Sequence, residues 1–216
     1  MNIHNYNNRK ESLIMKKDFF GRAEIEYYRN PCPVFALDEY KKDQGQDDFS
    51  RKQVWFYVYG DDEIEKEFHK ELKSLLESRF IDDEIDWDLM TLYPTHVKNE
   101  VNHNMQMLLK SLASELDIKY EQVIERNKTV QENHELEKEK AKAINLEGSI
   151  DVSDVEGKNV ILVDNISLTG ISLLHGCEGL YDKGAENVFG LCLGLGTEFP
   201  NKELINRDKK ASELLQ

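Results

Sequence analysis

Residues 158–172 read KNVILVDNISLTGIS and join an apolar, β-forming run to a polar turn. The apolar run within 158–164 predicts a strand that is buried on both faces. After the turn, apolar residues recur every three or four positions, which predicts a helix that ends at Gly184. A second apolar run, 187–195, predicts the next strand. A strand, a helix and a further strand in this order are typical of a parallel sheet.

Upstream of this stretch, strand-like and helix-like segments alternate from about residue 54. The aromatic run VWFYVY is typical of a strand, and apolar residues at spacings of three and four predict helices. In chain order the predicted elements are a strand at 54–59, a helix that begins at the acidic residues 61–63, a strand at 87–93 and a helix over 97–112. The expected fold is therefore α/β, a twisted and mostly parallel sheet flanked by helices, with an additional N-terminal α+β region.

The remaining segments differ in composition. Residues 22–28 alternate as a strand does, and the polar residues 41–52 predict an exposed loop. Residues 125–142 have almost no apolar face, which indicates a solvated helix or a mobile excursion, and 144–152 indicate a short hairpin-like element. We expect three parts: an N-terminal extension or hood at 1–53, an α/β domain at 54–200 and a polar tail at 201–216.

The chain is acidic and has no predicted targeting segment. Its 28 Lys and Arg residues against 42 Asp and Glu residues give a net charge of −14, which disfavours a broad nucleic-acid-binding surface. The first twenty residues contain no apolar core, so no signal peptide is predicted. The longest weakly polar run, 188–196, is too short to cross a bilayer. We therefore expect a cytoplasmic protein without a membrane partner.

Three cysteines, Cys32, Cys177 and Cys192, lie far apart in the sequence. Their odd number and the lack of a CxxC pair support neither a disulfide framework nor a zinc ribbon. We expect them to be reduced and to pack as small core residues.

The polar turn has the chemistry of a phosphate site. Asp164 is expected at the carboxyl end of its strand, and Thr169-Gly170 is expected just before a helix. Backbone N–H groups at a helix start, together with Thr and Ser hydroxyls, bind phosphate, and Gly170 allows a close approach of the backbone. An ordinary strand–loop–helix, with Asp at a turn and Thr as the N-cap, explains the same residues.

The segment VILVDNISLTGIS resembles the signature of type I phosphoribosyltransferases, in which a hydrophobic strand precedes two acidic residues and a Thr-Gly turn. Residues 125–165 are similar to the ComF-type subgroup, although the Cys-rich zinc module of that subgroup is absent. The resemblance covers residues 86–196, roughly half of the chain. It implies a phosphoribosyltransferase-type α/β fold that binds 5-phosphoribosyl-1-pyrophosphate (PRPP).

The resemblance also implies roles for the residues of the signature. Asp164 and Asn165 occupy the catalytic acidic positions, and Asp164 contacts the ribose hydroxyls and, directly or through water, a metal. The family usually uses Mg²⁺, so the resemblance implies this cofactor. The residues that surround the 5′-phosphate are Leu168, Thr169, Gly170, Ile171 and Ser172.

Two further segments receive roles from the resemblance. The loop after Leu92 stands where the family places its pyrophosphate loop, and a flexible flap is implied C-terminal to it. The loop contacts are Thr95, His96 and Lys98, and the flap contacts are Arg126, Lys128, Gln131 and Lys142. His96 and Lys98 are equally explained as exposed surface residues.

Two departures from the family pattern bear on activity. Asn165 replaces the second acid and brings no charge, and Leu168 stands where some purine-handling members hold a catalytic acid. We expect an enzyme that transfers a phosphoribosyl group to or from a nitrogenous base with pyrophosphate as co-product. The alternatives are a non-catalytic sensor of PRPP or a nucleotide on the same fold, and an acidic interaction protein that self-associates as a homodimer through its aromatic N-terminal region.

Overall fold

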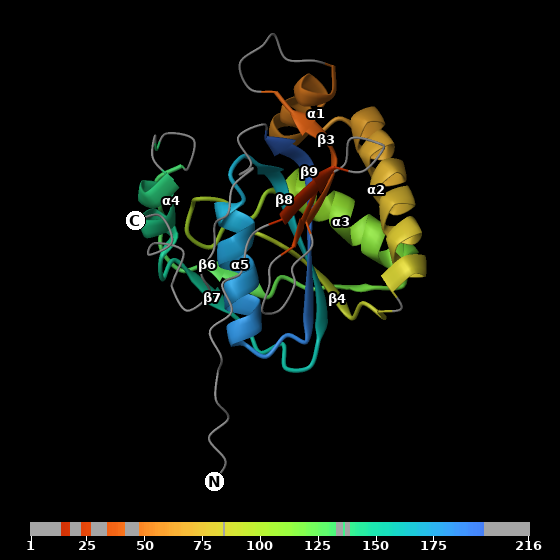
Figure 1. Cartoon of the computed structure of the whole chain (residues 1–216). Coiled ribbons are helices and arrows are strands. Elements are labelled where there is room, and N and C mark those ends of the chain that lie inside the picture. The colour runs from red at the N-terminus through yellow and green to blue at the C-terminus, as the bar shows by residue number, and fades with distance from the viewer. Residues whose placement is uncertain are drawn as a thin grey trace.

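A parallel sheet with helices on both faces forms the body of the protein (Figure 1). The computed structural model describes residues 14–17, 23–26, 34–41, 48–83, 85–132, 136 and 139–196. It describes the backbone alone for 14–17, 23–26, 79–83, 139–140 and 142–143. Much of the predicted N-terminal extension, the whole predicted tail and Cys32 lie outside the described residues.

Within the described residues the sheet has five strands in the order β3-β9-β8-β4-β5, and each neighbouring pair is parallel. This confirms the predicted mostly parallel sheet flanked by helices. The strands are β3 (Val34–Tyr40), β4 (Leu89–Leu92), β5 (Lys119–Tyr120), β8 (Asn159–Ser167) and β9 (Asn187–Gly196).

In the part of the chain that the structure describes, two antiparallel strand pairs accompany the sheet. They are β1 (Ile14–Lys17) with β2 (Ala23–Glu26), and β6 (Ile124–Arg126) with β7 (Ile150–Val152). The second pair corrects the prediction for 125–142, because that segment begins as a strand rather than as a solvated helix or a mobile excursion. The helix near the end of this segment is α4 (Glu139–Leu146). The pairing of β7 with β6 also shows that the hairpin expected within 144–152 is wrong.

Helices cover the two faces of the sheet. Figure 1 shows α5 (Ile171–Asp182) on one side of β8 and β9, with α2 (Asp62–Asp83) and α3 (His103–Glu115) on the other. In β8, Val160 and Leu162 join the core beneath α5, whereas Ile161 and Val163 join the core beneath the other helices. Successive side chains of a strand point to opposite faces, so an unbroken apolar run fills two cores.

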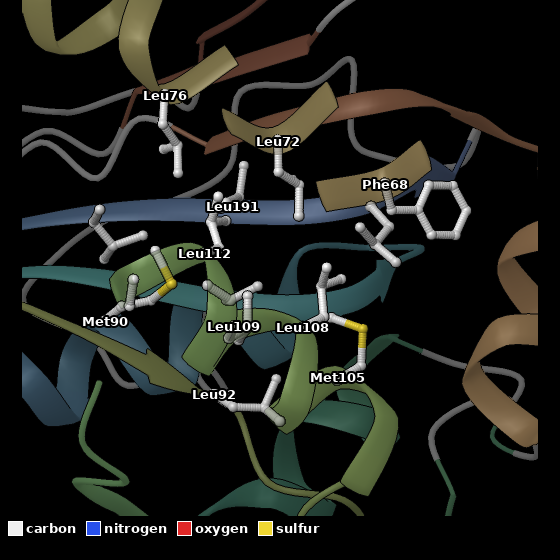
Figure 2. Close-up of a cluster of buried hydrophobic side chains, with 14 of the residues drawn as sticks. Phe68, Leu72, Leu76, Met90, Leu92, Met105, Leu108, Leu109, Leu112 and Leu191 are labelled. Atoms are coloured by element: carbon white, nitrogen blue, oxygen red, sulfur yellow. The ribbon is translucent and has the colours of Figure 1, made fainter. Parts of the chain in front are cut away.

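The larger core lies between the sheet and helices α2 and α3 (Figure 2). Side chains from α2, α3, β4 and β9 meet there and are almost fully buried. The labelled members are Phe68, Leu72, Leu76, Met90, Leu92, Met105, Leu108, Leu109, Leu112 and Leu191. The spacing of three and four residues within each helix is the pattern from which these helices were predicted.

The aromatic run at 54–59 is helical, so the predicted strand is wrong. It belongs to α1 (Asp48–Tyr59), which also contains the last residues of the segment 41–52 that was predicted as a loop. The buried residues Ser50, Gln53 and Phe56 are spaced by three, while Trp55 and Tyr59 are exposed. That is helical periodicity, which the β-forming composition of the run concealed. Strand β3 precedes α1 and pairs with β9, so the sheet extends N-terminal to residue 54.

The described residues bear on membrane-spanning helices and on the state of the cysteines. Within them, no helix has both the length and the apolar character needed to span a membrane. Cys177 and Cys192 are buried free thiols, as the prediction of core cysteines requires.

We expect Leu108→Ala to lower the free energy of unfolding by about 2–5 kcal/mol, because it leaves a cavity in a packed core. Its matched control is Met107→Ala, the preceding residue of α3, whose side chain is exposed; that change is expected to stay within about 0.5 kcal/mol. Urea denaturation of both variants measures the difference. Equal losses would contradict the described orientation of α3.

Candidate functional site

A cleft of about 440 Å³ lies where β8 enters α5. Tyr93, Arg126 and Leu146 line it, together with five further parts of the chain. They are the end of β8 with the following turn, the start of α5, the loop after β4 (94–96), the segment 130–132, and Tyr40 with Tyr57 from β3 and α1. The site thus lies beyond the carboxyl ends of parallel strands, where ligands of open α/β sheets bind.

The turn between β8 and α5 has the geometry of an anion site. Gly170 is the N-cap of α5 with φ 78° and ψ −10°, a left-handed conformation that suits glycine, and no side chain caps the helix there. The amide groups of the first helical turn point N-terminally, where they favour an anion. The residues that the sequence assigned to a phosphate, Leu168, Thr169, Gly170, Ile171 and Ser172, all line the cleft.

Gly196 allows this turn to lie against the end of β9. A Cβ atom at Gly196 would stand 2.8 Å from the Cα of Leu168, closer than side chains tolerate. A glycine at the end of the neighbouring strand is therefore required for the position of the turn. Beside it, the Ser167 hydroxyl lines the cleft, is buried, and has no hydrogen-bond partner among the described residues.

Asp164 lies in the cleft with an altered acidity. Its Oδ1 accepts a hydrogen bond of 2.8 Å from the Asn165 backbone N–H. Burial raises the pKa of Asp164 to about 7, against the opposing effects of that hydrogen bond and of the Arg126 charge. At neutral pH this carboxyl group can therefore accept or donate a hydrogen bond toward a ligand hydroxyl.

Asn165 does not line the cleft, which departs from its expected place beside Asp164. Strand β8 continues to Ser167, so consecutive side chains still alternate at this point. Gln53 Nε2 of α1 donates hydrogen bonds to Asn165 Oδ1 at 3.3 Å and to the Asn165 backbone carbonyl at 2.8 Å. Gln53 is fully buried, and a Cβ at Gly194 would come within 2.4 Å of its Oε1.

Arg126 is a buried wall residue rather than an exposed contact of a flexible flap. Only 1% of the Arg126 surface is exposed, and its guanidinium is surrounded by hydrogen-bond acceptors. It donates to the carbonyl of Thr95 at 2.9 Å, to the Ser149 hydroxyl at 2.5 Å and, more weakly, to the carbonyl of Pro94 at 3.4 Å. It also lies over the Tyr93 ring, 5.2 Å from the centroid. Its charge therefore lies directly behind the loop 94–96.

The predicted pyrophosphate loop reaches the cleft with two of its three residues. Thr95 and His96 line the cleft, whereas Lys98 is exposed and is not among the lining residues. Residues 98–99 instead form hydrogen bonds with β6 and the segment after it. Lys98 N–H donates to Thr129 Oγ1 at 3.1 Å, and Asn99 N–H donates to the carbonyl of Arg126 at 2.9 Å.

Of the remaining predicted flap residues, one lines the cleft and one does not. Gln131 lines the cleft. Its backbone N–H donates to Asn145 Oδ1 at 3.2 Å, and its backbone carbonyl accepts from Asn145 Nδ2 at 2.8 Å. Lys128 points elsewhere, since its Nζ donates to the Glu147 carbonyl at 3.0 Å. Lys142 lies in α4, and its side chain is outside the described residues.

The cleft residues that were not predicted include Tyr40, Tyr57 and Glu132. Burial, and next the charges of Asp164, Glu100 and Glu132, raise the pKa of Tyr57 to about 12. No sequence signal identified these residues. Tyr57 and Glu132 occur in stretches interpreted as a strand and as a solvated segment, and Tyr40 occurs in a part of the N-terminal extension for which no element was predicted.

A buried pair supports the cleft from behind. The Tyr93 hydroxyl lies 3.0 Å from His175 Nδ1 in α5, and burial raises the pKa of Tyr93 to about 12. Burial, and next the Arg126 charge, lower the pKa of His175 to about 4, so that the imidazole is neutral at pH 7. The pair joins the β4 loop to α5 without adding charge.

No family model and no curated protein matches the chain. Among solved structures, it is similar to adenine phosphoribosyltransferase from Saccharomyces cerevisiae, with 19% identity over 65% of this chain and 73% of the other and a TM-score of 0.44. The hypoxanthine phosphoribosyltransferase of Trypanosoma cruzi has 11% identity over 66% and 72%, with a TM-score of 0.44.

A third similar structure is the glutamine PRPP amidotransferase from B. subtilis, with 15% identity over 80% of this chain but only 36% of the other and a TM-score of 0.41. The chain thus spans about a third of that protein.

Asp164→Asn is expected to stabilise the protein without ligand. Because folding raises the pKa of Asp164 to about 7, the folded state holds more protons than the unfolded state between about pH 4 and pH 7, and the free energy of unfolding falls as the pH rises through that window. In the variant the free energy of unfolding should not fall over this pH window, and at pH 8 it should exceed that of the wild type by on the order of 2 kcal/mol. Urea denaturation at several pH values measures it, and an unchanged pH profile would contradict the burial of Asp164.

Proposed function

We propose that the protein binds PRPP or another ribose 5-phosphate ligand in the cleft and transfers the phosphoribosyl group to or from a nitrogenous base, with pyrophosphate as co-product. The observation that carries the proposal is the uncapped N-terminus of α5 at the left-handed Gly170, beside the half-buried Asp164. The two features suit the two ends of one ligand, a phosphate and a ribose.

In this proposal the turn 168–172 surrounds the 5′-phosphate. The amides of the first turn of α5 donate to the phosphate oxygens, and Thr169 and Ser172 line the cleft beside them. Asp164 contacts the ribose hydroxyls. The charge of Arg126, behind the loop 94–96, adds positive potential to an otherwise acidic protein.

Group transfer breaks the bond between the anomeric carbon and the pyrophosphate and forms a bond from that carbon to a ring nitrogen. The protein would orient the ribose, stabilise the developing charges and exclude water. Asp164 is suited to the first task. Tyr40 and Tyr57, which line the cleft, offer flat apolar surfaces for the base.

The implied Mg²⁺ fits the cleft as an ion that arrives with the ligand. Mg²⁺ binds through one or two carboxylates together with substrate phosphates, and the Asp164 carboxyl group supplies such an oxygen donor. In the described part of the chain, no group of three or more His, Cys, Asp or Glu side chains forms a metal site. When bound, the ion would neutralise pyrophosphate charge, with Asp164 holding it directly or through water.

A non-catalytic sensor on the same fold is the second candidate. The observation that favours it is the position of Asn165, whose side chain bonds to Gln53 rather than lining the cleft. Leu168, in the turn, also has no proton to transfer. A sensor would bind the ligand and gain stability from it without releasing pyrophosphate, so a pyrophosphate-release assay with PRPP and a panel of bases separates the two candidates.

We expect Gly170→Ala to weaken ribose 5-phosphate binding at least tenfold, because a side chain at φ 78° strains the turn that surrounds the phosphate. Gly157→Ala is the matched control, since Gly157 also has a left-handed φ, 66°, and lies outside the cleft, where an added Cβ atom would meet no atom within 4 Å. Both variants should lose a similar free energy of unfolding, about 1–2 kcal/mol. Titration calorimetry measures binding, and equal affinities in the two variants would contradict the proposal.

A further inference from the structure

Helix α1 forms one wall of the cleft through Tyr57. Among the described residues that line the cleft, three are tyrosines: Tyr40, Tyr57 and Tyr93. Tyr40 and Tyr93 are buried, with 8% and 6% of their surface exposed, whereas Tyr57 is partly exposed. Tyr57 is therefore the lining tyrosine whose ring a ligand in the cleft reaches most easily.

A buried hydrogen bond fixes α1 against the strand that carries Asp164. Gln53 Nε2 donates to the backbone carbonyl of Asn165 at 2.8 Å, and Asn165 directly follows Asp164 in β8. Tyr57 is four residues after Gln53, so it lies on the same side of α1, about 6 Å farther along the helix axis. In Figure 1, α1 lies at the end of the sheet at which β8 finishes. The hydrogen bond thus holds the wall that contains Tyr57 beside the proposed ribose contact.

The other end of α1 is fixed by the start of α3. Asn102 Nδ2 donates to the carbonyl of Tyr57 at 3.0 Å, and Asn104 Nδ2 donates to the carbonyls of Phe56 and Tyr57 at 3.1 and 3.2 Å. The last carbonyls of a helix have no partner within the helix, so these amide groups hold its final turn. Tyr57 therefore lies between two fixed points of α1, of which Gln53 is the one bonded to β8.

Core packing alone does not explain the amide group of Gln53. The side chain is fully buried, and its Oε1 has no hydrogen-bond partner among the described residues. A buried acceptor without a partner lowers stability, and an apolar side chain of the same size would avoid that cost. Gly194 leaves room for this oxygen, since a Cβ atom there would stand 2.4 Å from it. The unfavourable group indicates that the donor at the other end of the amide has a role.

We propose that Gln53 is a positioning residue, which through its hydrogen bond to Asn165 holds Tyr57 where its ring stacks on the base of a nucleoside 5′-monophosphate. The inference rests on the proposed function and assigns the wall that contacts the base. The base is attached to the anomeric carbon, next to the carbon that bears the 2′-hydroxyl. A ribose whose hydroxyls contact Asp164 therefore carries its base close to that residue. Asn165, at the position that the resemblance gives to a second catalytic acid, serves here to anchor α1.

The test is titration calorimetry of the full chain with ribose 5-phosphate and with the four common ribonucleoside 5′-monophosphates. The wild type should bind the tightest of the four about tenfold or more tightly than ribose 5-phosphate, because a base gains affinity by stacking on an aromatic ring. Gln53→Met keeps the length of the side chain and removes the donor. It should reduce this ratio to below about threefold, while the affinity for ribose 5-phosphate changes by less than about twofold.

Variants of Tyr57 separate the ring from the hydroxyl. Tyr57→Ala should lose the same preference for the nucleotide as Gln53→Met, and Tyr57→Phe should keep it, since the flat ring remains. A purely structural role of Gln53 would weaken both kinds of ligand equally. Urea denaturation shows which variants are folded, and a loss of folding in both Gln53→Met and Gln53→Leu would assign the hydrogen bond to stability and overturn the positioning role.

Gln122→Met is the matched control. Gln122 Nε2 also donates to backbone carbonyls, those of Leu92 and Ile124 at 2.7 and 2.6 Å, and Gln122 does not line the cleft. Its loss should leave the ratio unchanged. An unchanged ratio in Gln53→Met, an equal fall in Gln122→Met, or a wild type that binds ribose 5-phosphate as tightly as every nucleotide overturns this inference and leaves the proposed function intact. If the wild type binds none of these ligands, the proposed function fails, and this inference fails with it.

Discussion

The alternation of side chains along β8 is the constraint on which the cores and the site depend. Because β8 is covered on both faces, consecutive residues must serve two different environments, and each apolar residue from Val160 to Val163 fills one of two cores. The same alternation brings Asp164 into the cleft and turns Asn165 to Gln53. The position of the carboxyl group therefore follows from the register of a buried strand, which is costly to shift.

A second buried group shapes the opposite wall. Arg126 joins the carbonyls of the β4 loop to Ser149 beside β7, so the segment that follows β6 begins from a fixed point. A buried guanidinium without such partners would destabilise the fold strongly. Backbone carbonyls satisfy its donors but leave its charge in place, which gives an acidic chain a local positive potential behind the cleft.

Sequence reasoning succeeded where a pattern has one physical interpretation. The apolar runs of β8 and β9 and the apolar stripes of α2 and α3 specify their elements, and Gly170 specifies the turn between β8 and α5. It failed for α1, because aromatic and β-branched residues favour strands in composition while the burial of Gln53 and Phe56 follows helical spacing. It also missed Glu132 and misjudged Arg126, since their positions depend on β6 pairing with β7 and on contacts between distant segments. No local pattern reveals such contacts.

The account holds that a helix N-terminus and one carboxyl group let an acidic protein bind a phosphorylated ribose. The most direct measurement is an NMR titration of the ¹⁵N-labelled chain with ribose 5-phosphate, which follows each backbone amide. The account predicts that the largest shifts occur at the amides of residues 169–172, with smaller shifts near Asp164 and none along the exposed face of α2. Saturating ligand that leaves the amides of 169–172 unmoved, or that shifts a different region, would contradict it.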